Sequence, residues 1–139
     1  MQFEERTIIN AAPEKIFPFY ENVSEWSSWD PDVLSSSIDG NFVRGAKGKL
    51  KPAKGPEASI EFMEVIKNKS FTTISKLPLC TMSFDHKLIH SNGMTEVVHK
   101  VSFKGLLSPI FGRLIGSEIK KGLPDTLKGL KNIVESKGS

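Results

Sequence analysis

The sequence predicts an α+β domain in which a curved antiparallel sheet of about six to seven strands wraps around one long C-terminal helix. Apolar residues from Phe111 to Val134 recur at steps of four or three, the spacing of one helix face. From Val33 to Gly105 the apolar period is two, which is typical of strands. Since no earlier stretch has a comparable helical period, the sheet must pack on this C-terminal helix.

The composition is that of one globular domain spanning residues 1–139. Of these residues, 38% are hydrophobic and 25% are charged, and no apolar run approaches the ~20 residues of a membrane span. The start, MQFEER, has no signal-peptide core, and the single Cys80 cannot form an internal disulfide, so a cytoplasmic protein is expected. The net charge of +3 is too small to predict nucleic-acid binding. We expect no nucleic-acid partner, no cofactor and no integral membrane segment.

The N-terminal region predicts one strand followed by two short helices. Residues 2–10 alternate in polarity, as a strand does. One helix is expected from Pro13 to about Asn22, and Ser24 can cap the second. Trp26 and Trp29 are three residues apart and therefore lie on one face of a helical turn. Both tryptophans plug the core, or one of them lines a cavity.

The middle of the chain predicts strands at Val33–Ile38, within 42–52, and at Ser59–Lys67 and Ser70–Leu77. Pairing about the Asn68-Lys69 turn places one set of side chains together, namely Phe62, Glu64, Ile66, Phe71, Thr73 and Ser75. The opposite face carries Met63, Val65 and Ile74 and is also partly apolar. The Phe62/Phe71 face is favoured as the inner one, although the pattern alone does not decide.

A second hairpin, Cys80–Ser91 with Met94–Gly105, is the most strongly predicted part of the sheet. Asn92-Gly93 is a strong signal for a two-residue type I′ turn, which fixes the register of the two strands. Four cross-strand pairs then share one face: Met82 with Phe103, Phe84 with Val101, His86 with His99, and Leu88 with Val97. The opposite face, with Asp85, Lys87, Glu96, Lys100, Ser102 and Lys104, is expected to be solvated.

The C-terminal helix, expected from Ser108 to Glu135, has two unusual features. Glycines occur on or beside its apolar face, at Gly112, Gly116, Gly122 and Gly129. Each costs roughly 1 kcal/mol relative to alanine, so the glycines either permit close helix–sheet contact or leave room for a guest. Ser108 is the expected N-cap. Pro124, in Gly122-Leu123-Pro124, is expected to kink or break the helix.

The opposed pair His86 and His99 is the most specific chemical feature of the sequence. On an otherwise apolar face, burial and mutual repulsion should lower the pKa of both His86 and His99. The pair could bond only to each other, to backbone or to water; it could contact a ligand; or it could act as acid and base. A metal site would need a third ligand such as Glu64 and is the least favoured interpretation. Cys80 is interpreted as a small core residue and His90 as solvated.

Four short stretches carry a resemblance to a known family: Ile9–Phe17 (INAAPEKIF), Trp29-Asp30-Pro31, Met63-Glu64-Val65, and Gly129-Leu130-Lys131 with Glu135. They resemble, in that order, the strand-to-helix opening, the Trp-x-Pro, the central strand and the end of the long helix of the SRPBCC superfamily. This superfamily includes the START, birch-pollen-allergen and polyketide-cyclase groups. The resemblance spans nearly the whole chain. It implies the helix-grip fold, with a cavity between sheet and helix that takes hydrophobic small molecules.

The expected function is the binding or transport of a hydrophobic small molecule (a lipid, polyketide or aromatic metabolite) in that cavity. The alternative is a cofactor-free enzyme of the polyketide cyclase or dehydratase type, with His86 and His99 as its acid and base. The residues expected to line the cavity are Trp26, Trp29, Phe62, Phe71, Met82, Phe84, His86, His99, Val101, Phe103, Phe111, Ile115 and Ile119.

Overall fold

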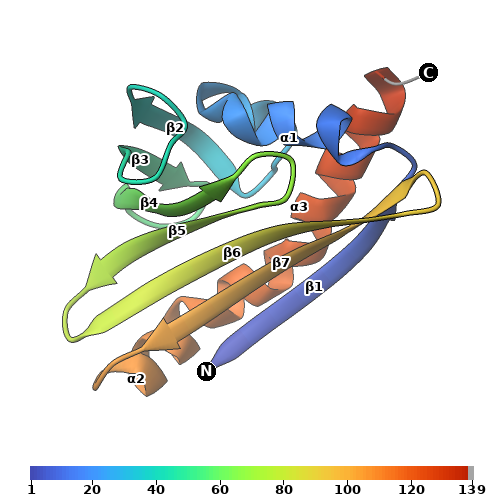
Figure 1. The fold of residues 1–139 in the computed structure, drawn as a ribbon. Coiled ribbons are helices and arrows are strands. Elements are labelled where there is room, and N and C mark those ends of the chain that lie inside the picture. The colour runs from blue at the N-terminus through green and yellow to red at the C-terminus, as the bar shows by residue number, and fades with distance from the viewer. Residues whose placement is uncertain (138–139) are drawn as a thin grey trace.

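The computed structural model describes residues 1–137 and consists of one seven-stranded antiparallel sheet with helices against its inner face (Figure 1). The strands are β1 (Gln2–Ile9), β2 (Val33–Asp39), β3 (Lys47–Pro52), β4 (Ala58–Ile66), β5 (Ser70–Leu77), β6 (Cys80–Ser91) and β7 (Met94–Lys104). Their order across the sheet is β1-β7-β6-β5-β4-β3-β2. The helices are α1 (Pro13–Glu21), the 3-10 helix η1 (Val23–Ser28), α2 (Ser108–Leu114) and α3 (Gly116–Lys137). The predicted fold class is confirmed.

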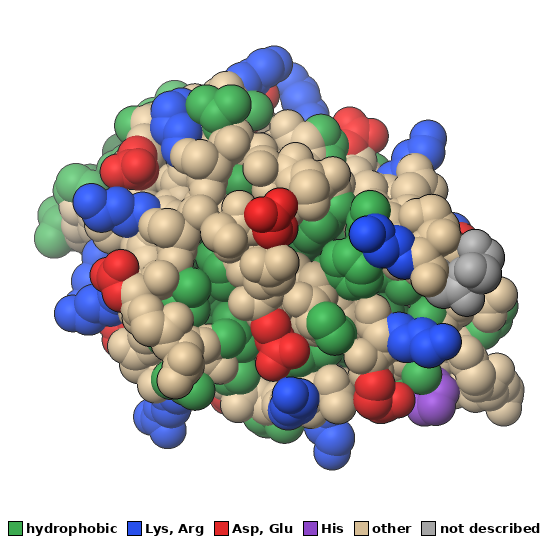
Figure 2. Space-filling model, turned by 90° about the horizontal axis from the view of Figure 1, so that it is seen from above, with side chains coloured by type: hydrophobic (Ala, Val, Ile, Leu, Met, Phe, Trp, Pro, Cys, Tyr) green, Lys and Arg blue, Asp and Glu red, His purple; other side chains and the backbone are tan. Residues whose placement is uncertain are grey.

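The long helix α3 packs chiefly against β1, at one edge of the sheet, and less against β7 (Figure 1). The short helices α1 and η1 follow β1 and close the opposite side of the core, with η1 packed against β2. No helix within residues 1–137 is long and apolar enough to cross a membrane. Figure 2 shows that charged side chains of both signs are interspersed with hydrophobic ones on the face seen from above.

The β6–β7 hairpin has the predicted register. Asn92 and Gly93 have positive φ values of 53° and 77°, as a type I′ turn requires. All four predicted cross-strand pairs occur, including His86 opposite His99. The outer face differs at one position, because Ser102 is buried where solvation was expected. It lies on β7, the second strand of the sheet, between Gln2 of the edge strand β1 and Ser83 of β6.

The β4–β5 hairpin differs from the predicted pairing because β4 contains a bulge. A two-residue Asn68-Lys69 turn would place Ile66 opposite Phe71, but Val65 is opposite Phe71. Phe62 pairs with Thr73, and the register shifts between Phe62 and Glu64. An extra residue on one strand turns every following side chain to the other face. The predicted inner face is therefore right for Phe62 and Phe71. It is wrong for Glu64 and Ile66, which are exposed.

The C-terminal helix is interrupted, but not where its proline predicted. Helix α3 continues through Gly122 and Pro124, and the interruption lies at Ile115, between α2 and α3. Pro124 cannot donate a hydrogen bond to the carbonyl oxygen of Lys120, four residues earlier. Both residues are exposed, so water can bind that carbonyl instead. The two predicted side-chain caps are also wrong: α2 is capped by Leu107 and η1 by Asn22, neither through a side chain.

The helix glycines allow close contact rather than leaving room for a guest. A Cβ atom on Gly116 would lie 2.6 Å from the Phe3 ring, and one on Gly122 would overlap the Asp32 carboxylate. On Gly129 it would overlap the backbone carbonyl of Trp29. The glycines therefore bring α3 against β1 and against the loop between η1 and β2.

Asp30 ties that loop to α3. Its Oδ1 accepts hydrogen bonds from the backbone N–H of Asp32 (2.9 Å) and from Thr126 Oγ1 (2.8 Å). Burial raises the pKa of Asp30 from 3.8 to about 6. Since the folded pKa is the higher one, this group contributes most to stability below pH ~4, and that contribution is lost as the pH rises through 6.

We therefore expect Asp30→Asn to raise the free energy of unfolding at pH 7.5 by about 1–3 kcal/mol, because one pKa unit corresponds to about 1.4 kcal/mol. The amide oxygen can still accept both hydrogen bonds, and the buried charge is removed. At pH 4 the gain should vanish. Urea unfolding at both pH values measures this, with Asp39→Asn at an exposed position as the control. A gain of equal size at pH 4 would show that the charge of Asp30 is not responsible.

Candidate functional site

Eleven of the thirteen predicted site residues divide between two packed clusters on the inner face. Trp26, Trp29, Phe62 and Phe71 belong to the first cluster, which also includes Phe17 and Tyr20 and is closely packed. The second cluster has a small buried centre that includes Val101 and Phe103. The remaining apolar residues surround that centre and are only partly buried; they are Met82, Phe84, Phe111, Ile115 and Ile119. We call these five the inner lining.

The two histidines lie between the clusters and contact both. The His86 ring stacks on Phe71 of the first cluster, with centroids 3.9 Å apart, and on Phe84 of the inner lining, with centroids 4.5 Å apart. Its Nδ1–H donates to the Phe71 carbonyl oxygen at 3.1 Å. In the neutral ring the proton is then on Nδ1, and Nε2 is an acceptor. His86 thus brings an acceptor to the border of the inner lining.

His99 is paired with a residue that sequence reasoning did not select. Tyr20, on the buried face of α1, places its hydroxyl 2.7 Å from His99 Nε2. The other ring nitrogen of His99, Nδ1, is buried and has no hydrogen-bond partner within residues 1–137. Tyr20 is the only tyrosine of the chain and lies on the apolar face predicted for this helix. That position was the one sequence feature that could have indicated a buried hydroxyl group near the histidines.

Both histidines are held in the neutral form. Burial lowers the pKa of His99 to about 3. Burial, and next the neighbouring His99, lower the pKa of His86 well below 6.5, although its hydrogen bond to Phe71 acts in the opposite direction. Burial also raises the pKa of the Tyr20 hydroxyl. The three groups are therefore uncharged at neutral pH, and a base with a pKa of about 3 abstracts protons weakly there.

The structure gives no support to a metal at the histidines. Glu64, the expected third ligand, is exposed on the outer face because of the β4 bulge. Among residues 1–137, no group of three or more His, Cys, Asp or Glu side chains could hold a metal ion. Cys80 is buried and His90 is exposed.

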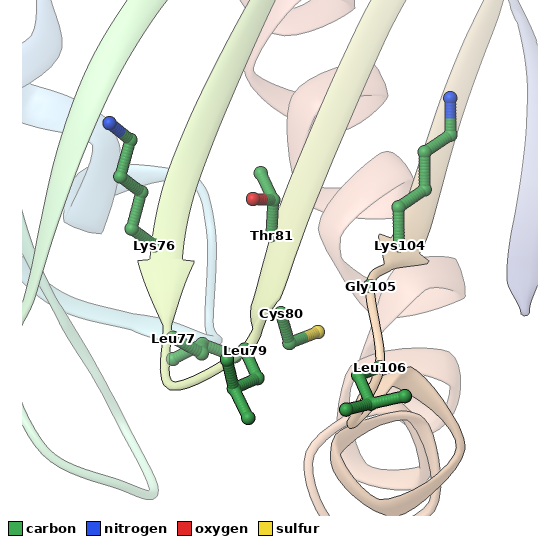
Figure 3. A pocket seen from close by; sticks show the side chains of 8 residues that line it. All are labelled: Lys76, Leu77, Leu79, Cys80, Thr81, Lys104, Gly105 and Leu106. Atoms are coloured by element: carbon green, nitrogen blue, oxygen red, sulfur yellow. The ribbon is translucent and has the colours of Figure 1, made fainter.

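Two hollows on the surface of residues 1–137 lie outside the predicted site. The larger, of about 420 Å³, is at the end of the sheet where the β5–β6 turn meets the β7–α2 loop (Figure 3). It is lined by Lys76, Leu77, Leu79, Cys80, Thr81, Lys104, Gly105 and Leu106. The smaller, of about 140 Å³, lies between β1 and α3. None of the thirteen predicted residues lines either hollow, so their contact with a ligand stays a prediction.

Comparison with known proteins relates the chain to solved structures by fold. No protein-family model matches the sequence, and no curated protein matches it significantly. A START superfamily protein from Mycobacterium smegmatis is 14% identical, with a TM-score of 0.72 and 97% of each chain covered. Norcoclaurine synthase from Thalictrum flavum, in complex with dopamine and hydroxybenzaldehyde, is 12% identical, with a TM-score of 0.75; the match covers 98% of this chain and 87% of the synthase.

A third similar structure is Ara h 8.0201, which is 17% identical, with a TM-score of 0.74 and 98% of each chain covered. At such low identity these similarities establish the fold alone. The matches nevertheless extend over nearly the whole chain and include a named START superfamily protein. The chain therefore has the helix-grip fold that its sequence resemblance to the SRPBCC superfamily predicted.

Proposed function

We propose that the protein binds a hydrophobic small molecule against the inner lining, between β6 and the α2–α3 junction. The observation that carries this proposal is the incomplete burial of five apolar side chains that all belong to the inner side of the sheet–helix layer. Covering apolar surface is worth about 25 cal/mol per Å². The closely packed cluster around Tyr20 and Phe71 offers no comparable surface.

The surroundings of the inner lining favour an apolar or aromatic ligand that carries a hydroxyl group. His86 stacks on Phe84 of the lining, and its neutral ring keeps Nε2 as a hydrogen-bond acceptor. Such sites are usually apolar with a few placed polar groups. A neighbour with the same fold, norcoclaurine synthase, was solved with two small aromatic molecules. Lipids and polyketides remain within the proposed ligand class, and carriage of the ligand is part of the proposal.

A cofactor-free cyclase or dehydratase is the second candidate. The Tyr20–His99 hydrogen bond favours it, because a hydroxyl joined to an imidazole is a common route for proton transfer. The lowered pKa of both histidines weakens it, since neither ring is an effective base at neutral pH. Binding is therefore the function that the geometry supports best.

We expect 1-anilinonaphthalene-8-sulfonate to bind the protein with micromolar affinity and to be displaced by a medium-chain fatty alcohol. Ile119→Asp, within the inner lining, should weaken dye binding at least about tenfold, or ~1.4 kcal/mol. Ile89→Asp is the matched control, because Ile89 is an exposed isoleucine on the outer face of β6. Fluorescence titration measures the dye affinity of the wild type, the Ile119 variant and the Ile89 variant. Equal binding by the Ile119 and Ile89 variants would contradict the proposed site.

A further inference from the structure

One end of the molecule exposes an apolar group that the core does not use. It consists of Leu79 in the β5–β6 turn, Leu106 in the β7–α2 loop, and Ile110 and Leu114 on α2; we call these four residues the apolar tip. Leu106, Leu114 and Leu79 are 80%, 69% and 65% exposed, the highest values among the large hydrophobic side chains of residues 1–137. Isolated exposed leucines are ordinary, but a cluster of them indicates an interaction site.

The spacing of residues on α2 places Ile110 and Leu114 on one side of this short helix. Leu107, Phe111 and Ile115 pack into the second cluster. Ile110 and Leu114 follow the same four-residue step one position earlier and lie on a neighbouring, solvent-facing side of α2, and Leu106 is exposed in the loop just before the helix. The short helix is thus apolar on two sides, of which one packs against the second cluster and the other faces solvent.

The local backbone holds Leu79 beside Leu106. The Leu107 N–H donates to the Leu79 carbonyl at 3.0 Å and joins the turn to the loop. Leu79 has a φ of 52°, in the left-handed region that leucine seldom adopts. At Gly105, a Cβ would lie 2.6 Å from the Leu79 carbonyl oxygen. The turn and the loop are therefore in close backbone contact. Leu79 is nevertheless exposed and has an unfavourable backbone conformation.

Positive charges predominate near the tip, and the nearest acidic residue along the chain, Glu118, forms an ion pair with Lys121. The two segments that form it, residues 76–81 and 104–117, contain Lys76, Lys104 and Arg113 and no acidic residue. None of the three basic side chains forms an ion pair within residues 1–137, whereas several other lysines do. Figure 3 shows the side chains of Lys76 and Lys104 extending back along the sheet, away from the leucines.

We propose that the apolar tip docks on a membrane surface that contains anionic phospholipids. The leucines would enter the boundary between headgroups and acyl chains, and the lysines, set back from them, would lie at the level of the phosphates. This layering matches how interfacial helices combine apolar contact with attraction to anionic lipid. Four side chains are few for a protein partner, since a standard interface uses about 20 to 30 residues a side.

Sedimentation with lipid vesicles tests the proposal. The protein should bind vesicles of phosphatidylcholine with about one third phosphatidylglycerol, and bind pure phosphatidylcholine vesicles at least about tenfold more weakly. The double variant Leu106→Glu/Leu114→Glu should lose at least about tenfold in affinity for the anionic vesicles. Leu34→Glu is the matched control, because Leu34 is 63% exposed on β2, and it should change binding less than about twofold.

A charge-reversal pair isolates the role of the basic residues. Lys76→Glu/Lys104→Glu should also weaken binding at least about tenfold. The control Lys69→Glu/Lys87→Glu makes the same change in net charge at the opposite end of β5 and β6. Absence of vesicle binding by the wild type, or equal losses in the tip and control variants, would overturn the proposal. A concentration-dependent dimer that the leucine variant abolishes, without vesicle binding, would assign the tip to a second copy instead.

This inference does not depend on the proposed function. The vesicle assay contains no small-molecule ligand, and the tip residues are distinct from the inner lining. The protein could therefore bind vesicles even if it does not bind the dye, and it could bind the dye even if it does not bind vesicles.

Discussion

Phe71→Ala is expected to lower the free energy of unfolding by about 3–5 kcal/mol, the range for truncating a buried phenylalanine. The Phe71 side chain is 1% exposed and its ring contacts those of Tyr20, Trp26, Phe62 and His86. Large rigid rings surround the site on several sides, so they cannot close over the space that the substitution leaves. A domain of this kind has only about 5–15 kcal/mol of stability in total.

Urea unfolding monitored by circular dichroism measures this loss. Val43→Ala, at a half-exposed position of the neighbouring loop, is the control and should change stability by less than about 0.5 kcal/mol. Alanine keeps the backbone carbonyl that accepts the His86 hydrogen bond, so the change reports side-chain packing. A loss below about 1 kcal/mol would mean that the first cluster is loosely packed and has room for a ligand.

The fold and the inner face of the β6–β7 hairpin followed from local rules in the sequence. The Asn92-Gly93 turn determines the register by itself, and through it the opposition of His86 and His99. Alternation then assigns the buried face without knowledge of the rest of the chain. The long helix was predictable for the same reason, because the period of its apolar face is a local property.

The remaining features depend on contacts between distant segments. Nothing within β4 marks the bulge that turns Glu64 outward, so the metal alternative could not be dismissed from pattern alone. Tyr20 meets His99 across 79 residues of sequence, and only the packing of α1 onto the sheet reveals that hydrogen bond. The glycines of the C-terminal helix were ambiguous because the segments that touch them, around Phe3, Trp29 and Asp32, lie far away in the chain.

The split of the thirteen residues into two unlike groups has the same origin. The strand residues lie on the faces that were predicted or favoured as the inner ones. Periodicity cannot show that Phe62 and Phe71 are covered by α1 and η1, whereas Phe84 and Met82 lie near α2 and are incompletely covered. The candidate ligand site therefore occupies part of the predicted surface, and the tightly packed histidine end is the less favoured part.

Gly129→Ala is expected to lower the free energy of unfolding by about 1–3 kcal/mol, although alanine is the better helix former by roughly 1 kcal/mol. The added Cβ would overlap the backbone oxygen of Trp29. Because that oxygen belongs to the loop between η1 and β2, relief requires α3 and the loop to move apart. The same movement would disturb the hydrogen bond between Thr126 and Asp30.

Gly112→Ala provides the matched control, since it makes the same substitution in α2. There the added Cβ would meet the sulfur of Met1, an exposed and flexible side chain that can move away. We expect the Gly112 variant to remain within about 1 kcal/mol of the wild type by urea unfolding, and the Gly129 variant to lie clearly below it. If Gly129→Ala is as stable as Gly112→Ala, α3 is not held against the loop at this point. The space between helix and sheet would then be adjustable enough to admit a ligand there as well.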